Sequence, residues 1–177
     1  MKNLVLVGMP GAGKSTVGVI LAKVLGINFT DTDLLIQQRE NRLLQQIINE
    51  DGIKRFLEIE EAVILDLDIK NHVIATGGSV VYSPKAMAKL KDDGIIIYLQ
   101  LEYHDLEERI KNIKTRGIVM ERGQTLGGIY RERLPLYEKY KDITINCSQR
   151  TIEEVIAIIV GKLRLEYPEF GCIIKGY

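Results

Sequence analysis

The chain has 177 residues and a mass of 20.0 kDa, a length that favours one domain with a buried core. Its 24 basic and 24 acidic residues leave a formal net charge of zero, which argues against binding nucleic acid or an anionic membrane. No apolar run approaches the ~20 residues of a membrane span, and the two cysteines lack metal-binding spacing. We therefore expect one domain over residues 1–177, cytoplasmic and monomeric, without nucleic acid or membrane as a partner.

Short apolar runs alternate with helical patterns along the chain. Strands are predicted over residues 4–7, 28–30, 73–75, 95–98 and 143–145. Helices are predicted over residues 14–25, 34–39, 44–49, 53–67, 84–91, 103–111 and 151–164. This alternation predicts parallel β-α-β units and an α/β sheet with helices on both faces. A Gly-rich, charged stretch over 115–124 is predicted to be a mobile loop, and residues 165–177 are assigned no element or role.

The clearest motif is Gly-Met-Pro-Gly-Ala-Gly-Lys-Ser over residues 8–15. It matches G-x-x-x-x-G-K-[ST] between a predicted strand and a predicted helix, which is the context of a phosphate-binding P-loop. Its glycines turn backbone N–H groups towards phosphate oxygens, and the start of the helix adds its positive dipole end. We expect a nucleoside triphosphate to bind here, with Lys14 on the β- and γ-phosphates and Ser15 on Mg²⁺. The residues expected to bind it are Gly11, Ala12, Gly13, Lys14, Ser15 and Thr16.

The other motifs of P-loop proteins narrow the class. The strings Asn-Lys-x-Asp and Asp-x-x-Gly of GTPases do not occur, nor does the Leu-Ser-Gly-Gly signature of transporter ATPases. A small phosphotransferase remains, and it needs an acceptor site within reach of the γ-phosphate. Asp31 and Asp33 follow the second predicted strand, at the sheet edge where ligands of α/β proteins bind. We expect Asp31 to face Mg²⁺ and Asp33 an acceptor hydroxyl, the alternative being that either one only caps a helix.

Two further segments are candidates for the same site. Gly77 and Gly78 follow the third predicted strand and allow close backbone approach to a ligand, although a plain turn explains them equally well. The segment 109–141 holds nine basic and three acidic residues, a balance that suits a lid closing over a polyphosphate. Within it we assign function to Arg116 and Arg133. For four of its other cations we favour a solvated helix face, namely for Lys111, Lys114, Arg122 and Arg131.

Taken together, these motifs resemble the shikimate kinase family. The resemblance covers residues 2–164 and rests on the P-loop, Asp31-Thr32-Asp33, Thr76-Gly77-Gly78, Arg116 and Arg133-x-Pro135-Leu136-Tyr137. It implies a three-layer P-loop kinase fold with a five-stranded parallel sheet in the order 2-3-1-4-5, and a mobile lid over about 113–125. It also implies ATP and Mg²⁺, and transfer of the γ-phosphoryl group to a hydroxyl of a small carboxylic acid. The leading acceptor is shikimate, which would give shikimate 3-phosphate in aromatic amino-acid biosynthesis.

The resemblance also implies roles for single residues. Asp33 contacts the acceptor hydroxyl and takes its proton, and Arg133 binds the acceptor carboxylate. Lys14 and Arg116 act on the phosphates, which makes Lys14, Asp33 and Arg116 the expected catalytic set. Beyond these, the resemblance implies adenine contacts for Arg109 and Ser148, and acceptor contacts for Glu60, Gly77 and Gly78.

The chain departs from the family pattern at three positions. The family has Arg after the Phe of its third helix, pairing with a nearby Glu and with the acceptor carboxylate, whereas this chain has Leu57 after Phe56 and keeps Glu60. Ser79 stands where a third glycine is usual, and Gly117 stands where the lid has Pro. These changes concern the acceptor site more than the ATP site. Lys54, on the helix face of Leu57, is one candidate to replace the missing cation.

Two other functions therefore stay open. A different hydroxy acid such as homoserine is one alternative acceptor, because Glu58 or Glu60, without an Arg partner, could bind its ammonium group. A nucleotide-binding regulatory domain without phosphotransfer is the second alternative. The intact P-loop and the pair Asp31 and Asp33 argue against it.

Overall fold

The sheet has five parallel strands, as the sequence predicts. The computed structural model describes residues 1–111, 119–120 and 123–171. Its strands run in the order β2-β3-β1-β4-β5, which confirms the predicted order 2-3-1-4-5. Their bounds are β1 Asn3–Val7, β2 Asn28–Asp31, β3 His72–Ala75, β4 Gly94–Gln100 and β5 Ile143–Asn146.

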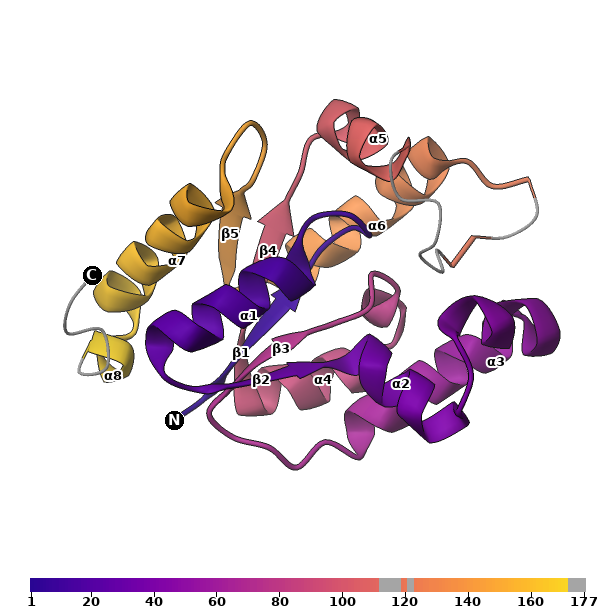
Figure 1. The fold of residues 1–177 in the computed structure, drawn as a ribbon, viewed down its shortest axis with the longest axis horizontal. Helices are drawn as coiled ribbons and strands as arrows, with labels where there is room; N and C mark the ends of the chain where they lie inside the picture. The colour runs from indigo at the N-terminus through magenta and orange to yellow at the C-terminus, as the bar shows by residue number, and fades with distance from the viewer. Residues whose placement is uncertain (112–118, 121–122, 172–177) are drawn as a thin grey trace.

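Helices cover both faces of this sheet (Figure 1). On one face, α1 packs beside α7, while α4 and α6 pack against β4 on the other. The pair α2 and α3 extends beyond the β2 edge of the sheet (Figure 1). No helix in the described ranges has the length and apolar character needed to cross a membrane. The bounds are α1 Lys14–Leu25, α2 Thr32–Glu40, α3 Leu44–Leu65, η1 Val80–Tyr82, α4 Pro84–Asp93, α5 Tyr103–Lys111, α6 Leu126–Tyr140, α7 Ile152–Glu166 and α8 Pro168–Gly171.

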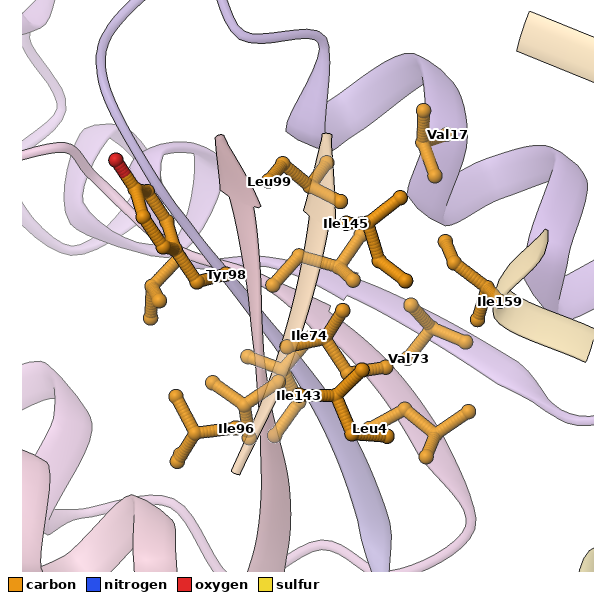
Figure 2. Packing of buried hydrophobic residues seen from close by; sticks show 14 of the residues in the cluster. Leu4, Val17, Val73, Ile74, Ile96, Tyr98, Leu99, Ile143, Ile145 and Ile159 are labelled. Atoms are coloured by element: carbon orange, nitrogen blue, oxygen red, sulfur yellow. The ribbon is translucent and has the colours of Figure 1, made fainter. Parts of the chain in front are cut away.

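The central strands β1 and β4 are mostly apolar because both faces of the sheet are buried there, whereas the edge strand β2 is polar and only partly buried. Every residue of β1 from Leu4 to Val7 is completely buried, as expected for a central parallel strand. Figure 2 shows Val17 of α1 and Ile159 of α7 reaching towards the sheet, where the register partners Leu99 and Ile145 lie side by side. This packing fixes the carboxyl ends of the strands, where the polar motifs are found.

The predicted break between helices 44–49 and 53–67 is confirmed, because the two helical segments of α3 meet at a kink where Gly52 is not helical (φ 83°). The prediction differs from the structure at α6. No helix is predicted over 126–140, yet α6 lies there, because two glycines and Pro135 obscure its pattern. The Thr125 hydroxyl caps α6 by accepting from the Gly128 N–H at 3.1 Å. One face of the helix is buried at four-residue spacing by Ile129, Arg133 and Tyr137.

Candidate active site

The P-loop has the backbone shape that a phosphate site requires. Gly8 and Gly13 have φ values of 146° and 93°, and a Cβ at Gly8 would lie 2.6 Å from the Leu99 carbonyl oxygen. Gly13 precedes α1, whose first turn has no side-chain cap and no acidic residue among the described contacts. The backbone N–H groups and the positive dipole end of this helix start are therefore directed at the place where an anion would bind.

Lys14 and Ser15 project from the first turn of α1 into one cavity. The Lys14 ammonium group is nearly buried and donates to the carbonyl oxygens of Gly8 and Met9, at 2.8 and 3.0 Å. These contacts hold the cation over the loop, where it would meet the phosphates of a nucleotide. Of the other predicted loop residues, Gly11 and Ala12 are buried and Thr16 is exposed.

Asp31 joins the P-loop to the end of β2. The Ser15 hydroxyl donates to Asp31 Oδ2 at 2.7 Å, and Asp31 Oδ1 accepts from the Asp33 N–H at 3.0 Å. Asp31 is thus the N-cap of α2, as one of the two sequence interpretations expects, and it is also the partner of Ser15. Its role towards Mg²⁺ stays a prediction. No cluster of three His, Cys, Asp or Glu side chains occurs in the described residues. A pair of oxygens such as these suits Mg²⁺, which typically completes its shell with phosphate and water.

The cavity that these residues line has a volume of about 320 Å³, and we call it the site cavity. Asp33 enters it from the start of α2, and Gly77 and Gly78 enter from the loop after β3. The site cavity therefore brings together seven of the predicted residues, namely Lys14, Ser15, Asp31, Asp33, Gly77, Gly78 and Arg133. The apolar and amide side chains on the remaining wall are Leu34, Gln37, Leu43, Leu44, Gln45, Phe56 and Val119.

Gly78 packs too closely against the P-loop to carry a side chain. A Cβ there would lie 2.7 Å from Pro10 Cδ and 3.2 Å from Arg133 Nη1. The Gly78 carbonyl also accepts from the Tyr137 hydroxyl at 2.6 Å, so the loop cannot simply retreat. Close approach, rather than a plain turn, explains this glycine.

We expect Gly78→Ala to lower the free energy of unfolding by about 1–3 kcal/mol, because the rigid Pro10 ring must be displaced. The displacement reaches both halves of the site, so the KM for the nucleotide and the KM for the second substrate both rise. Urea denaturation and steady-state kinetics measure the two effects. The control is Gly161→Ala in α7, where a Cβ meets nothing within 4 Å and helix propensity predicts equal or higher stability. A Gly78→Ala protein as stable as the wild type would contradict the steric argument.

Glu60 lies behind Gly77, completely buried in α3. Its Oε2 accepts from the Ser79 hydroxyl at 2.7 Å, while its Oε1 has no hydrogen-bond partner in the described structure. A Cβ at Gly77 would lie 2.2 Å from Glu60 Oε1 and 3.0 Å from Asp33 Oδ1, so both carboxyl groups approach the same glycine. Burial is the main cause that raises the pKa of Glu60, to about 7, and the neighbouring Asp33 raises it further.

This shifted pKa predicts a pH dependence of stability. Between the ordinary value of 4.5 and about 7, folded Glu60 holds a proton that the unfolded chain has lost. The free energy of unfolding therefore falls as pH rises through this window and levels off above it. Glu60→Gln cannot ionise, so urea denaturation from pH ~5 to ~8 should show a flatter profile. Glu58→Gln, at an exposed site on the same helix, is the matched control. If the free energy of unfolding fell equally steeply with pH in the wild type and in Glu60→Gln, Glu60 would not be the source of the pH dependence.

Arg133 of α6 brings a buried guanidinium to the wall of the site cavity. Its Nε donates to the Tyr82 hydroxyl at 3.1 Å, and its Nη2 donates to the Val119 carbonyl at 2.8 Å. The guanidinium carbon also lies 5.0 Å from the centre of the Tyr82 ring, within cation–π distance. A planar fork held in this way is prepared to bind a carboxylate through its remaining N–H groups.

Leu57 lines a second cavity of about 230 Å³, which we call the lateral cavity. The lateral cavity shares Val119 with the site cavity and is also lined by Ile53, Tyr82, Gln124 and Glu132. Lys54 is exposed and lines neither cavity, so its position does not support a role in replacing the missing arginine. Glu58 is also exposed and pairs with Arg55 at 3.2 Å, and it lines neither cavity. The Glu58 carboxylate is therefore not placed to bind the ammonium group of an acceptor such as homoserine.

Arg109 lies on α5, which packs over the P-loop. A Cβ at Gly11 would be 3.3 Å from Ile110 Cγ1, so this helix and the loop are in close contact. The Arg109 charge favours the ionised form of the Cys147 thiol, just after β5, and so lowers the pKa of that thiol slightly against the larger effect of burial. The position of Arg109 is compatible with the expected contact to a nucleotide base.

Ser148 ties the carboxyl ends of β4 and β5 together. Its hydroxyl accepts from the Glu102 N–H at 2.8 Å, and its own N–H donates to Asn146 Oδ1 at 2.9 Å. The neighbouring Cys147 is buried, and burial raises the pKa of its thiol to about 11. A protonated, buried thiol suits packing rather than nucleophilic attack.

Arg116 and most of the predicted lid, about 113–125, lie outside the described residues. The part of this segment that the structure describes includes Val119, which packs against Phe56 and Ile59 of α3. Val119 thereby places its carbonyl on Arg133.

Three supporting residues escaped the sequence interpretation. Ser79 was noted only as a departure, although a hydroxyl beside a buried Glu is a natural hydrogen-bond donor. Tyr82 has no motif around it, and its role depends on α6 lying opposite. Tyr137 belongs to the Arg-x-Pro-Leu-Tyr motif but carried no assigned role until its bond to Gly78 placed it.

The fold and the site together define a class. A parallel sheet in this order, with a P-loop facing a cavity for a second small molecule, is the arrangement of a small-molecule kinase of the P-loop type. The family model described as shikimate kinase matches residues 10–164. The chain therefore belongs to the shikimate kinase family.

Individual relatives agree with this assignment. The chain is 36% identical over 163 residues to the shikimate kinase of Caldanaerobacter subterraneus subsp. tengcongensis, covering 90% of this chain and 95% of that protein. It is 37% identical over 163 residues to the shikimate kinase of Thermodesulfovibrio yellowstonii, covering 90% and 94%. Among solved structures, shikimate kinase from Acinetobacter baumannii in complex with shikimate superimposes with a TM-score of 0.85 at 31% identity, covering 93% of each chain.

Proposed function

We propose that the protein transfers the γ-phosphoryl group of ATP to a hydroxyl of shikimate, giving shikimate 3-phosphate and ADP. The observation that supports this most directly is the site cavity itself, into which Lys14, Asp33 and Arg133 all project. A phosphate-binding cation, a carboxylate and a carboxylate-binding guanidinium thus face one space of about 320 Å³. The relative from Acinetobacter baumannii, similar over 93% of the chain, was solved with shikimate bound.

The residues have complementary roles in this proposal. Arg133 binds the acceptor carboxylate and so orients the ring, while Asp33 accepts the proton of the attacking hydroxyl. The hydroxyl oxygen forms a bond to the γ-phosphorus as the bond to the β–γ bridging oxygen breaks. Lys14 and the N–H groups at the start of α1 stabilise the charge on the phosphates. Arg116 is assigned to the same phosphates by its place in the family motif.

We assign the metal to Ser15 and Asp31 and the base of ATP to the region of Arg109 and Ser148. Bound Mg²⁺ would neutralise charge on the β- and γ-phosphates. We further propose a cytoplasmic monomer built as one kinase domain over residues 1–177. The free, buried Cys147 suits a reducing compartment.

A coupled assay of ADP release with a panel of acceptors tests the proposal. The panel holds shikimate, homoserine and further small hydroxy acids, and ³¹P spectroscopy identifies the product. Shikimate-dependent ADP release with formation of a phosphate monoester is the expected result. Preferential turnover of homoserine would replace shikimate as the acceptor, and ADP release that no acceptor stimulates would favour a regulatory nucleotide-binding domain.

A further inference from the structure

The loop between β3 and α4 directs two hydroxyl groups at the site. Ser79 precedes the 3₁₀ turn η1, and Tyr82 is its last residue. The Tyr82 N–H donates to the Ser79 carbonyl at 2.9 Å, which closes the turn. Side chains three residues apart in a 3₁₀ turn lie one above the other, so Ser79 and Tyr82 share one side of the loop.

The Ser79 hydroxyl supports the carboxyl group of Glu60, which lies behind Gly77 of the site cavity. Ser79 and Glu60 are 3% and 2% exposed, and the hydrogen bond between them is the single described bond to the Glu60 carboxyl. Glu60 Oε1 lies on the side of Gly77 that also faces Asp33. Movement of the Glu60 carboxyl would therefore press on Gly77 and on Asp33. A buried acid with one donor depends strongly on that donor.

The Tyr82 hydroxyl supports the basic group of the site wall. It accepts from Arg133 Nε, and its ring lies under the guanidinium. With Nε on Tyr82 and one Nη2 N–H on Val119, the Nη1 edge is directed at Gly78 and the site cavity. Tyr82 therefore fixes which edge of Arg133 faces the acceptor.

Leu57 connects these two supports. It lies three residues before Glu60 on α3, so the two side chains are neighbours on the helix surface. It also lines the lateral cavity together with Tyr82. A long cationic side chain at position 57 would extend into that cavity, between Glu60 and Tyr82. Leucine offers no donor there, and the donor to Glu60 comes from Ser79 instead.

We propose that Ser79 and Tyr82 are positioning residues that determine acceptor binding. Ser79 holds the carboxyl group of Glu60, and Tyr82 holds the guanidinium group of Arg133. Both act in a site where residue 57 of α3 is a leucine and supplies no cation. The departures at positions 57 and 79 are then one coupled change. The inference rests on the proposed function and specifies how its acceptor site is held.

Ser79→Ala and Tyr82→Phe test the two supports separately. Each change removes one hydroxyl from a bond to a buried charged or ionisable group, so the KM for shikimate should rise about tenfold. The KM for ATP stays at the wild-type value and kcat changes less than about threefold, because neither hydroxyl contacts the phosphate loop. A purely structural role would instead lower thermal stability and worsen all three constants together.

Matched controls come from the same loop and from α6. Ser83→Ala removes another Ser–Glu hydrogen bond, of 2.6 Å to Glu61, four residues further along the loop. Tyr130→Phe removes a tyrosine hydroxyl that donates to the Leu101 carbonyl at 3.1 Å. Both controls should leave the KM for shikimate at the wild-type value. A rise in either control equal to that in the test variants would overturn the assignment.

A reciprocal exchange tests the coupling. Ser79→Gly should raise the KM for shikimate, and adding Leu57→Arg to it should restore most of the loss by supplying a donor to Glu60 from α3. Leu57→Arg alone should lower the KM for shikimate by less than it does in the Ser79→Gly background, because Ser79 already donates to Glu60 Oε2. Independent, additive effects of the two substitutions would refute the coupled change.

A cycle in unfolding free energy separates this inference from the proposed function. Ser79→Ala, Glu60→Gln and the double variant should be non-additive in urea, whatever acceptor the enzyme uses. Additive values overturn the Ser79–Glu60 support without any activity measurement. Wild-type protein that turns over no acid in the panel refutes the proposed function. Wild-type turnover of shikimate with unchanged Ser79→Ala and Tyr82→Phe kinetics refutes this inference alone.

Discussion

Lys14→Met should lower kcat by about a thousandfold. Lys14 is 7% exposed, and its ammonium group is held over the P-loop by two carbonyl oxygens, at 2.8 and 3.0 Å. It is therefore fixed where charge develops on the transferring phosphoryl group, and a transition-state contact of this kind acts on kcat more than on substrate binding. Methionine keeps the length of the side chain and removes the charge. Coupled ADP release at saturating ATP and shikimate measures the loss.

The control for this variant is Lys23→Met, on the same helix but exposed. Its kcat should equal that of the wild type. Circular dichroism and a fluorescent ATP analogue then separate lost chemistry from lost folding or nucleotide binding. A Lys14→Met enzyme within tenfold of wild-type kcat would show that the cation is dispensable to the transition state.

The sheet was predictable because its signals are local. The strands β1, β3 and β4 contain short apolar runs that end near turn residues, and parallel pairing follows from the helices between the strands. The P-loop was equally local, since eight consecutive residues carry both the backbone turn and the cation. Asp31 shows the value of this locality, because its side chain caps α2, as the residue type predicts, and also accepts from Ser15 of the P-loop.

The supports of the acceptor site were not predictable in the same way. The Ser79–Glu60 bond joins residues 19 positions apart, and the Arg133–Tyr82 bond joins residues 51 positions apart. No helix or strand periodicity relates residues at these separations, so the sequence alone does not indicate that they are partners. The position of Arg133 also depends on α6. The glycines and Pro135 of this helix weaken the helical signal in the sequence, and tertiary packing keeps the segment helical. The sequence therefore identified the charged groups of the site but not the hydroxyl groups that hold them.

Asp33→Asn should lower kcat by about a hundredfold to ten-thousandfold, the range expected when a general base is lost. Asp33 follows the cap residue of α2 and lines the site cavity, with its Oδ1 directed at the Gly77 side. Asparagine preserves the shape and can still accept a hydrogen bond from the acceptor hydroxyl, so the KM for shikimate changes less than kcat. Steady-state kinetics at saturating ATP, supported by ³¹P detection of product, measures both constants.

Two comparisons make the Asp33 result specific. Asp66→Asn removes an exposed carboxylate that pairs with Arg39 at 2.7 Å and should leave kcat unchanged. Asp31→Asn weakens the metal side instead, so added Mg²⁺ should recover part of its activity, while Asp33→Asn does not respond to Mg²⁺. If Asp33→Asn retained kcat within tenfold of the wild type, proton removal by Asp33 would be excluded. Because Glu60 is the other carboxyl beside Gly77, the double variant with Glu60→Gln would then show whether that group takes the proton.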